Sequence, residues 1–67
     1  MMTKKIKEQI LKVRDTGLVN MCSVKEVQRV AYDMELFDLV LYIEDRPKEY
    51  FHFILTGEAE WAEGEEP

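Results

Sequence analysis

The chain has 67 residues, a formal net charge of −5 and a single cysteine. This length allows one small domain, and a lone cysteine excludes an internal disulfide and fits a reducing compartment, so we expect a cytoplasmic protein. No segment approaches the roughly 18 consecutive apolar residues of a membrane-spanning helix, and no apolar stretch follows the N-terminal lysines as in a signal peptide.

Charge is distributed unevenly along the chain. Residues 58–67 contain five glutamates and no basic residue, whereas residues 1–57 contain nine acidic and nine basic residues. We therefore expect a single helical domain over residues 1–57 and an acidic C-terminal tail over residues 58–67. The tail has too few apolar residues to be expected to pack as a further core element.

A helix is predicted between Thr3 and Thr16. Ile6, Ile10 and Val13 recur at helical spacing, Thr3 is a suitable N-cap, and a glycine follows the last turn. The basic residues of this segment are candidates for binding phosphate or an acidic surface, although a solvated helix face is their commoner role. These residues are Lys4, Lys5, Lys7, Lys12 and Arg14.

The second predicted helix covers Val24–Met34. Ser23 and Glu26 have the spacing of a capping box, in which each side chain accepts a hydrogen bond from the other residue's backbone N–H. Cys22 and Val27 stand at the positions of a hydrophobic staple, so the cysteine is interpreted as a small apolar residue.

The third segment, Leu36–Glu44, is almost entirely apolar, with Asp38 as its one polar interruption. A buried strand would fit this run equally well, but no partner strand is available to pair its backbone, and we predict a helix. A helix that is apolar nearly all round must be covered, which in so small a domain favours a dimer interface or a partner groove. The candidate contacts are Leu36, Leu41 and Tyr42.

A fourth helix is predicted from Pro47, at its first position, to the residue before Gly57. Beyond it, Trp61 is the one aromatic residue of the tail, and large aromatic side chains are enriched at binding hot spots. Three roles remain open for Trp61: a docking motif for a basic groove, a contact with its own domain, or a solvated side chain.

The predicted fold is all-α, a compact bundle of four short helices that is expected to be dimeric. A small domain without disulfides gains stability from association. The predicted core comprises Ile6, Ile10, Val13, Val24, Val27, Val30, Ala31, Met34, Phe37, Val40, Ile43, Tyr50, Phe53 and Ile54.

Several kinds of chemistry find little support in the sequence. A helix-turn-helix would place the third helix in the DNA major groove, but that segment offers acidic residues such as Asp38 and no base. Cys22 and His52 are each the only residue of their type, which is too few ligands for zinc and no evidence of a nucleophilic pair. We expect no enzyme activity, no cofactor, no metal and no small-molecule substrate.

Several spaced motifs suggest a relationship to known proteins. They are Thr16-Gly17-Leu18 with Asn20-Met21, Val27-Gln28-Arg29 with Ala31-Tyr32, Leu39-Val40 with Tyr42-Ile43-Glu44, and Glu49-Tyr50 with Phe53-Ile54 and Thr56-Gly57-Glu58. Over residues 4–58 the chain resembles a family of very short proteins encoded by phages and mobile elements of Gram-positive bacteria, a domain of unknown function. The resemblance implies no activity or site residue, but such an origin favours a small binder that regulates or inhibits a host protein.

The function expected from the sequence is therefore that of a non-catalytic protein-binding module, acting through the third helix and the tail. Its partner is expected to be a second copy or a host protein. A nucleic-acid-associated accessory protein that uses the basic N-terminal helix is the alternative, and an enzyme is a third. The residues expected to contact a partner are Leu36, Leu41, Tyr42 and Trp61.

Overall fold

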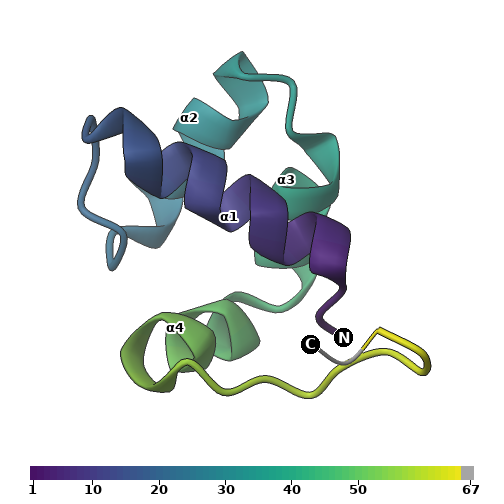
Figure 1. Ribbon diagram of the computed structural model, residues 1–67. Coiled ribbons are helices and arrows are strands. Elements are labelled where there is room, and N and C mark those ends of the chain that lie inside the picture. Colours follow the sequence, from purple (N-terminus) through teal and green to yellow (C-terminus); the bar gives the residue numbers. More distant parts are fainter. Residues whose placement is uncertain (66–67) are drawn as a thin grey trace.

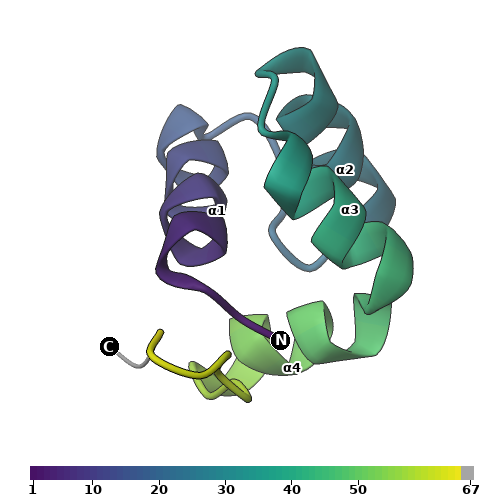
Figure 2. The same ribbon diagram turned by 90° about the vertical axis from the view of Figure 1, so that its right-hand side faces the viewer.

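Four α-helices make up the fold, which confirms the all-α prediction. The computed structural model describes residues 1–65 and has no β-strand among them. α3 contacts each of the other three helices, α1 lies across one side of α2 and α3, and α4 closes one end (Figures 1 and 2). The helices are α1 (Lys4–Thr16), α2 (Val24–Asp33), α3 (Phe37–Asp45) and α4 (Pro47–Thr56).

Both ends of α1 are capped as the sequence predicts. The Thr3 hydroxyl accepts a hydrogen bond from the backbone N–H of Ile6 at 3.1 Å, which satisfies one of the free donors of the first turn. Gly17 ends the helix in the left-handed conformation, with a φ of 66° that a residue without a Cβ adopts at little cost. The buried face of α1 carries Ile6, Ile10 and Val13, as predicted.

α2 begins at the predicted residue, but the predicted capping box is wrong. The Ser23 side chain makes no cap hydrogen bond, and the Ser23 backbone N–H donates instead to the carbonyl of Asn20 at 2.9 Å. The Asn20 side chain accepts in turn from the Cys22 N–H, so a turn rather than a reciprocal box sets the helix start. Cys22, which was predicted to pack on Val27 as a staple, is exposed.

The turn between α2 and α3 explains where the predicted core was wrong. Glu35 is left-handed, with a φ of 62°; its N–H donates to the carbonyl of Tyr32, and the Leu36 N–H donates to that of Ala31. These two bonds make a Schellman motif, which usually brings the residue after the left-handed position against the last turn of the helix. Leu36 is accordingly buried against the core, while Met34 and Phe37, predicted core residues, are exposed.

The rest of the predicted core is largely confirmed. Val24, Val40, Phe53 and Ile54 are half-buried and pack against the buried cluster. The cluster itself consists of Met2, Ile6, Ile10, Val13, Val27, Val30, Ala31, Leu36, Leu39, Tyr42, Ile43 and Tyr50.

A glutamine on α1 supplies the N-terminal cap that α3 lacks. The N-cap position of α3 is Leu36, whose side chain has no acceptor, so the first turn needs a partner from elsewhere. The Gln9 side-chain carbonyl accepts a buried hydrogen bond from the Leu39 N–H at 2.8 Å. On the other side of α3, the Gln28 amide donates to the carbonyl of Val40 at 3.2 Å. The two glutamines therefore hold α3 between α1 and α2.

Tyr50 fixes α4 to the loop between α1 and α2. Its side chain is fully buried, and its hydroxyl donates to the Met21 carbonyl at 2.8 Å. Burial raises the pKa of Tyr50 above its ordinary value because the phenolate loses its hydration, and the nearby Cys22 adds to the shift.

The first part of the tail packs on the domain, so the expectation that it would not do so is wrong. The Met2 N–H donates to the Glu60 carbonyl and the Ala62 N–H donates to the Met2 carbonyl, both at 2.9 Å, so the two termini lie together (Figures 1 and 2). Met2 is fully buried there, and Ala59 and Trp61 pack against the core. The last two residues of the predicted tail, 66–67, lie outside the described residues.

Candidate protein-docking surface

The α2–α3 turn gathers exposed apolar side chains into one surface, here called the corner patch and defined as Tyr32, Met34, Phe37 and Leu41. Tyr32 is 62 % exposed, Phe37 49 % and Leu41 61 %. The Tyr32 and Phe37 rings meet edge to face, with centroids 5.6 Å apart and planes at 72°. Leu41 follows Phe37 by one helical turn, so both lie on the same face of α3.

The backbone of the turn presents this surface at a cost in strain. A glutamate with a positive φ is unfavourable by about 1–2 kcal/mol because its Cβ approaches the following carbonyl. Glu35 adopts this conformation between the exposed Met34 and the buried Leu36. Strained residues of this kind concentrate at binding sites and switches, so Glu35 is a feature of the candidate site as well as of the fold.

Charged groups of both signs border the corner patch. The Lys5 ammonium and the Asp38 carboxylate form an ion pair of 2.9 Å beside it, with both side chains substantially exposed. Leu41 also lines a shallow groove with Asp38, Asp45 and Arg46. The surface therefore combines an apolar centre with a rim that offers donors and acceptors, which is the usual layout of a protein interface.

The structure separates the four residues predicted to contact a partner. Leu41 is exposed, but Leu36 and Tyr42 belong to the core, and for these two the prediction of a partner-facing side chain is wrong. Burial raises the pKa of Tyr42, and the negative charge of Glu49 adds to the shift. Sequence spacing could not distinguish these residues from Leu41, because α3 is apolar on nearly every side and only its packing decides which side chains remain free.

Trp61, the fourth predicted contact, is half-buried against its own domain. The backbone beside it pairs with Met2, and the Lys7 ammonium lies 5.9 Å from the centre of its ring, within the range of a cation–π contact. The tail also returns to α1 at Glu65, whose carboxylate accepts from the Lys4 N–H at 3.3 Å. This carboxylate supplies negative charge at the N-terminus of α1, where the first turn of the helix contains lysines and no acidic residue.

The five basic residues proposed to bind phosphate do not form one cluster. At 100° per residue, Lys4, Lys7 and Arg14 lie along one side of α1, whereas Lys5 and Lys12 lie along the other. Lys5 is paired with an aspartate of α3, and the acidic residues Glu8 and Asp15 separate the two rows. Two short rows with an acidic strip between them are a poor match for a continuous phosphate backbone.

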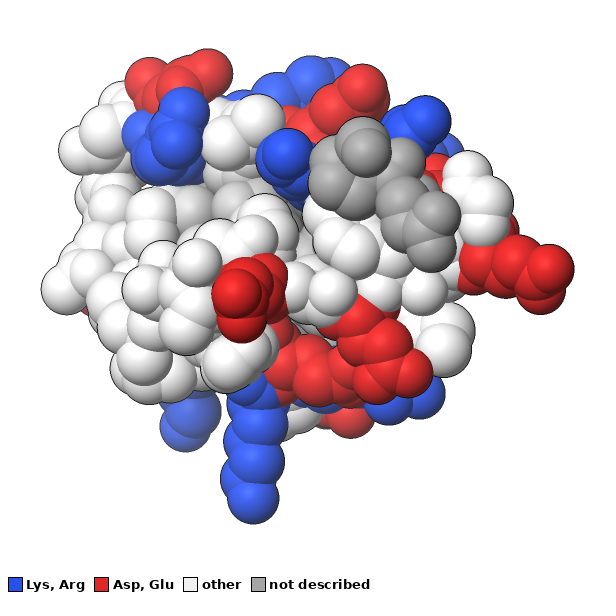
Figure 3. Space-filling view, turned by 60° about the horizontal axis from the view of Figure 1, so that its bottom comes forward, with Lys and Arg blue, Asp and Glu red and all other residues white. Residues whose placement is uncertain are grey.

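Other chemistry receives no specific support from the described part of the chain. Residues 1–65 contain no group of three or more histidine, cysteine, aspartate or glutamate side chains placed to hold a metal ion. None of the described helices has the length and apolar character needed to cross a bilayer. A second uncharged surface is visible at the left of Figure 3. On α4, Phe51 and Leu55 are exposed apolar side chains.

Comparison with known proteins gives one match. The family model described as domain of unknown function (DUF5049) matches residues 2–58, which is nearly the whole helical body. No curated protein and no solved structure matches the chain.

Proposed function

We propose that this chain, which belongs to the DUF5049 family of domains of unknown function, is a small non-catalytic protein-binding module that self-associates through its corner patch. We extend the proposal, from the sequence resemblance, to a phage or mobile-element origin in Gram-positive bacteria. The module would act in the cytoplasm and regulate or inhibit a host protein.

The observation that carries the proposal is the exposure of Tyr32 and Phe37, whose rings contact each other, together with the exposed Leu41 one helical turn beyond Phe37 on α3. The largest apolar patch on a typical monomer measures about 300–600 Å² and is often functional. An aromatic side chain has about 150–250 Å² of surface, so Tyr32 and Phe37, each about half exposed, contribute about 200 Å² together. The exposed side chains of Leu41 and Met34 add to this area and bring the patch to about the size of the largest apolar patch on a typical monomer.

The rim supports a second copy as the occupant. In a twofold dimer the same patch meets itself, so residue i of one copy contacts residue j of the other and the reverse. Phe37 and Leu41, one turn apart, suit an antiparallel pairing of two α3 helices in which each contacts the other. A rim that carries both Lys5 and Asp38 is compatible with its own image, because each charge can face its opposite.

The area of the corner patch limits the affinity of the proposed dimer. Stable complexes bury about 800 Å² per partner, and the patch offers roughly half of that. We therefore expect a weak, reversible dimer, which is best measured at high protein concentration.

Sedimentation velocity across a concentration series tests the proposal. The wild-type chain should show a concentration-dependent rise toward dimer, and Leu41→Lys should shift the series to monomer because it places a charge at the centre of the patch. Leu55→Lys on α4 is the matched control: it makes the same change at a side chain of similar exposure, 63 % against 61 %, and should leave the association intact.

Two outcomes would overturn the proposal. A wild-type chain that stays monomeric throughout the series would remove the dimer. Loss of association in Leu55→Lys but not in Leu41→Lys would transfer the interface to the exposed face of α4.

A further inference from the structure

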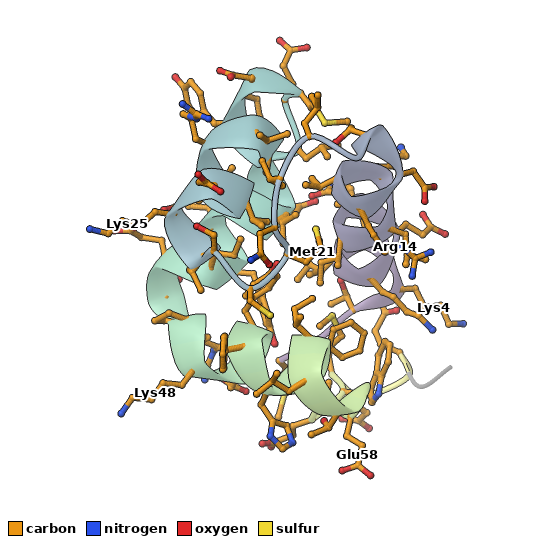
Figure 4. All side chains as sticks on the ribbon, turned by 90° about the vertical axis from the view of Figure 1, so that its left-hand side faces the viewer. Lys4, Arg14, Met21, Lys25, Lys48 and Glu58 are labelled. Carbon is orange, nitrogen blue, oxygen red and sulfur yellow. The ribbon has the colours of Figure 1, made fainter. Side chains whose placement is uncertain are left out.

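A groove between α1 and α4 is a second surface with the character of a binding site. Its volume is about 360 Å³, within the about 300–1,000 Å³ that is usual for ligand pockets. It lies on the side of α1 away from the Lys5–Asp38 pair, and in Figure 4, which faces this side, Met21 stands between α1 and α2 above α4. The apolar lining consists of Ile10, Leu11, Met21, Phe53 and Ile54.

The charges of this groove distinguish it from its neighbours. Among residues 1–65, its lining includes Lys7 and Arg14 and no carboxylate. By contrast, the groove beside Leu41 includes Asp38 and Asp45, and the one between α4 and the tail includes three glutamates. A positive potential over an apolar floor selects for a partner that carries apolar and acidic groups together.

The two cations are spaced and held so that they can face a ligand. Lys7, Leu11 and Arg14 follow each other at i, i+4 and i+7, which places them in one row along the edge of the groove. Arg14 is well exposed, and its ion pair with the adjacent Asp15 is long at 3.8 Å, so its planar donors remain available to a carboxylate. The Trp61 ring holds Lys7 in place by the contact described above.

We infer that the α1–α4 groove binds an acidic amphipathic helix of a partner protein. The partner's apolar side chains, spaced at i, i+3, i+4 and i+7, pack on the floor formed by Met21, Phe53 and Ile54. Its carboxylates pair with Arg14 and Lys7 at the edge. The groove and the corner patch lie on different sides of α1, so the inference stands independently of self-association: each copy of the proposed dimer would present one groove.

Methionine methyl resonances make the inference testable site by site. The chain has four methionines, of which Met21 lines the groove and Met34 belongs to the corner patch. The probe is an amphipathic peptide of about 15 residues, with leucines on one face and glutamates on the other. Titration of the full chain should shift the Met21 methyl signal saturably and leave that of Met34 unchanged, whereas dilution of a dimer should move Met34 and not Met21.

Charge reversal on α1 supplies the matched controls. Arg14→Glu should weaken the peptide about tenfold or more, because a carboxylate would replace the cation at the groove edge. Lys12→Glu makes the same reversal on the other side of the same helix and should change the dissociation constant less than about twofold. A peptide with lysine in place of each glutamate should bind far more weakly.

The inference is wrong if the acidic peptide produces no saturable shift at Met21. It is equally wrong if the lysine peptide binds as tightly as the glutamate peptide, or if the two charge reversals weaken binding to the same extent. None of these results bears on the corner patch, which Met34 and sedimentation report separately.

Discussion

The hydrogen bond from the Leu39 N–H to Gln9 offers a quantitative test of how α3 is held. The Gln9 side chain is 7 % exposed and accepts at 2.8 Å, in a buried setting without an alternative acceptor of α3's own. Gln9→Met keeps an unbranched side chain of similar length and removes the acceptor. The change leaves a buried backbone N–H without a partner, which costs about 1–3 kcal/mol.

A loss of about 2 kcal/mol corresponds to a large change in melting temperature for so small a domain. At about 4–8 °C per kcal/mol, Gln9→Met should melt about 8–16 °C below wild type when followed by circular dichroism. Gln28→Met is the comparison, because Gln28 bonds to α3 from a half-buried position where water can replace it. Gln28 also donates to the Glu44 carboxylate at 2.9 Å, but this bond is exposed to solvent and contributes little, so the cost of Gln28→Met should stay at about 0.5–1.5 kcal/mol, that of an ordinary hydrogen bond.

Gln9→Glu retains an acceptor and adds a charge at the N-terminus of α3, which the helix dipole favours but burial opposes. At pH values where the new carboxyl group is ionised, the Gln9→Glu variant should therefore be more stable than the Gln9→Met variant. Equal melting temperatures for wild type and Gln9→Met, or equal losses in Gln9→Met and Gln28→Met, would refute the tertiary cap.

Further predictions concern the strained turn, the buried tyrosine and the tail. Glu35→Gly should raise the free energy of unfolding by about 0.5–1 kcal/mol in urea titrations, since glycine relieves the left-handed strain; a loss of stability would contradict the turn geometry. The pKa of Tyr50 lies above its ordinary 10.0 in the folded state, so this tyrosine ionises first in the unfolded chain as the pH rises. Its contribution to the free energy of unfolding is therefore complete below pH 10 and declines above pH 10, by up to about 1.4 kcal/mol per pH unit. Tyr50→Phe should reduce the fall of the free energy of unfolding with pH above pH 10, and the part that remains is due to Tyr42, whose pKa is also raised. An unchanged dependence on pH would exclude Tyr50 as its source. Trp61→Ala should reduce the hydrogen-exchange protection of the Met2 and Ala62 amides, and protection equal to wild type would show that the ring does not hold the two termini together.

The helices themselves could be predicted because their signals are local. Thr3 and Gly17 mark the ends of α1, and the spacing of its isoleucines marks the buried face. The error over Phe37 has a different origin: Glu35 takes the left-handed position that glycine usually occupies, so the sequence carries no sign of the Schellman motif that turns Leu36 inward.

The contacts that complete the candidate sites join distant parts of the chain. Gln9 bonds to a helix 30 residues away, and nothing around Gln9 in the sequence distinguishes it from a surface glutamine. The pairing of Met2 with the tail is equally invisible, because Trp61 is surrounded by glutamates that suggest a solvated segment. The groove of Met21, Phe53 and Ile54 arises only when α4 folds back on α1.

Contact between the corner patches of two copies is the central claim, and an isotope-filtered NOE experiment measures it most directly. In a concentrated mixture of labelled and unlabelled chains, only contacts between copies give filtered signals. We expect NOEs from the Phe37 ring protons of one copy to the Leu41 methyl groups of the other. A filtered spectrum without those signals, or one in which Leu55 of α4 replaces Leu41, would contradict it.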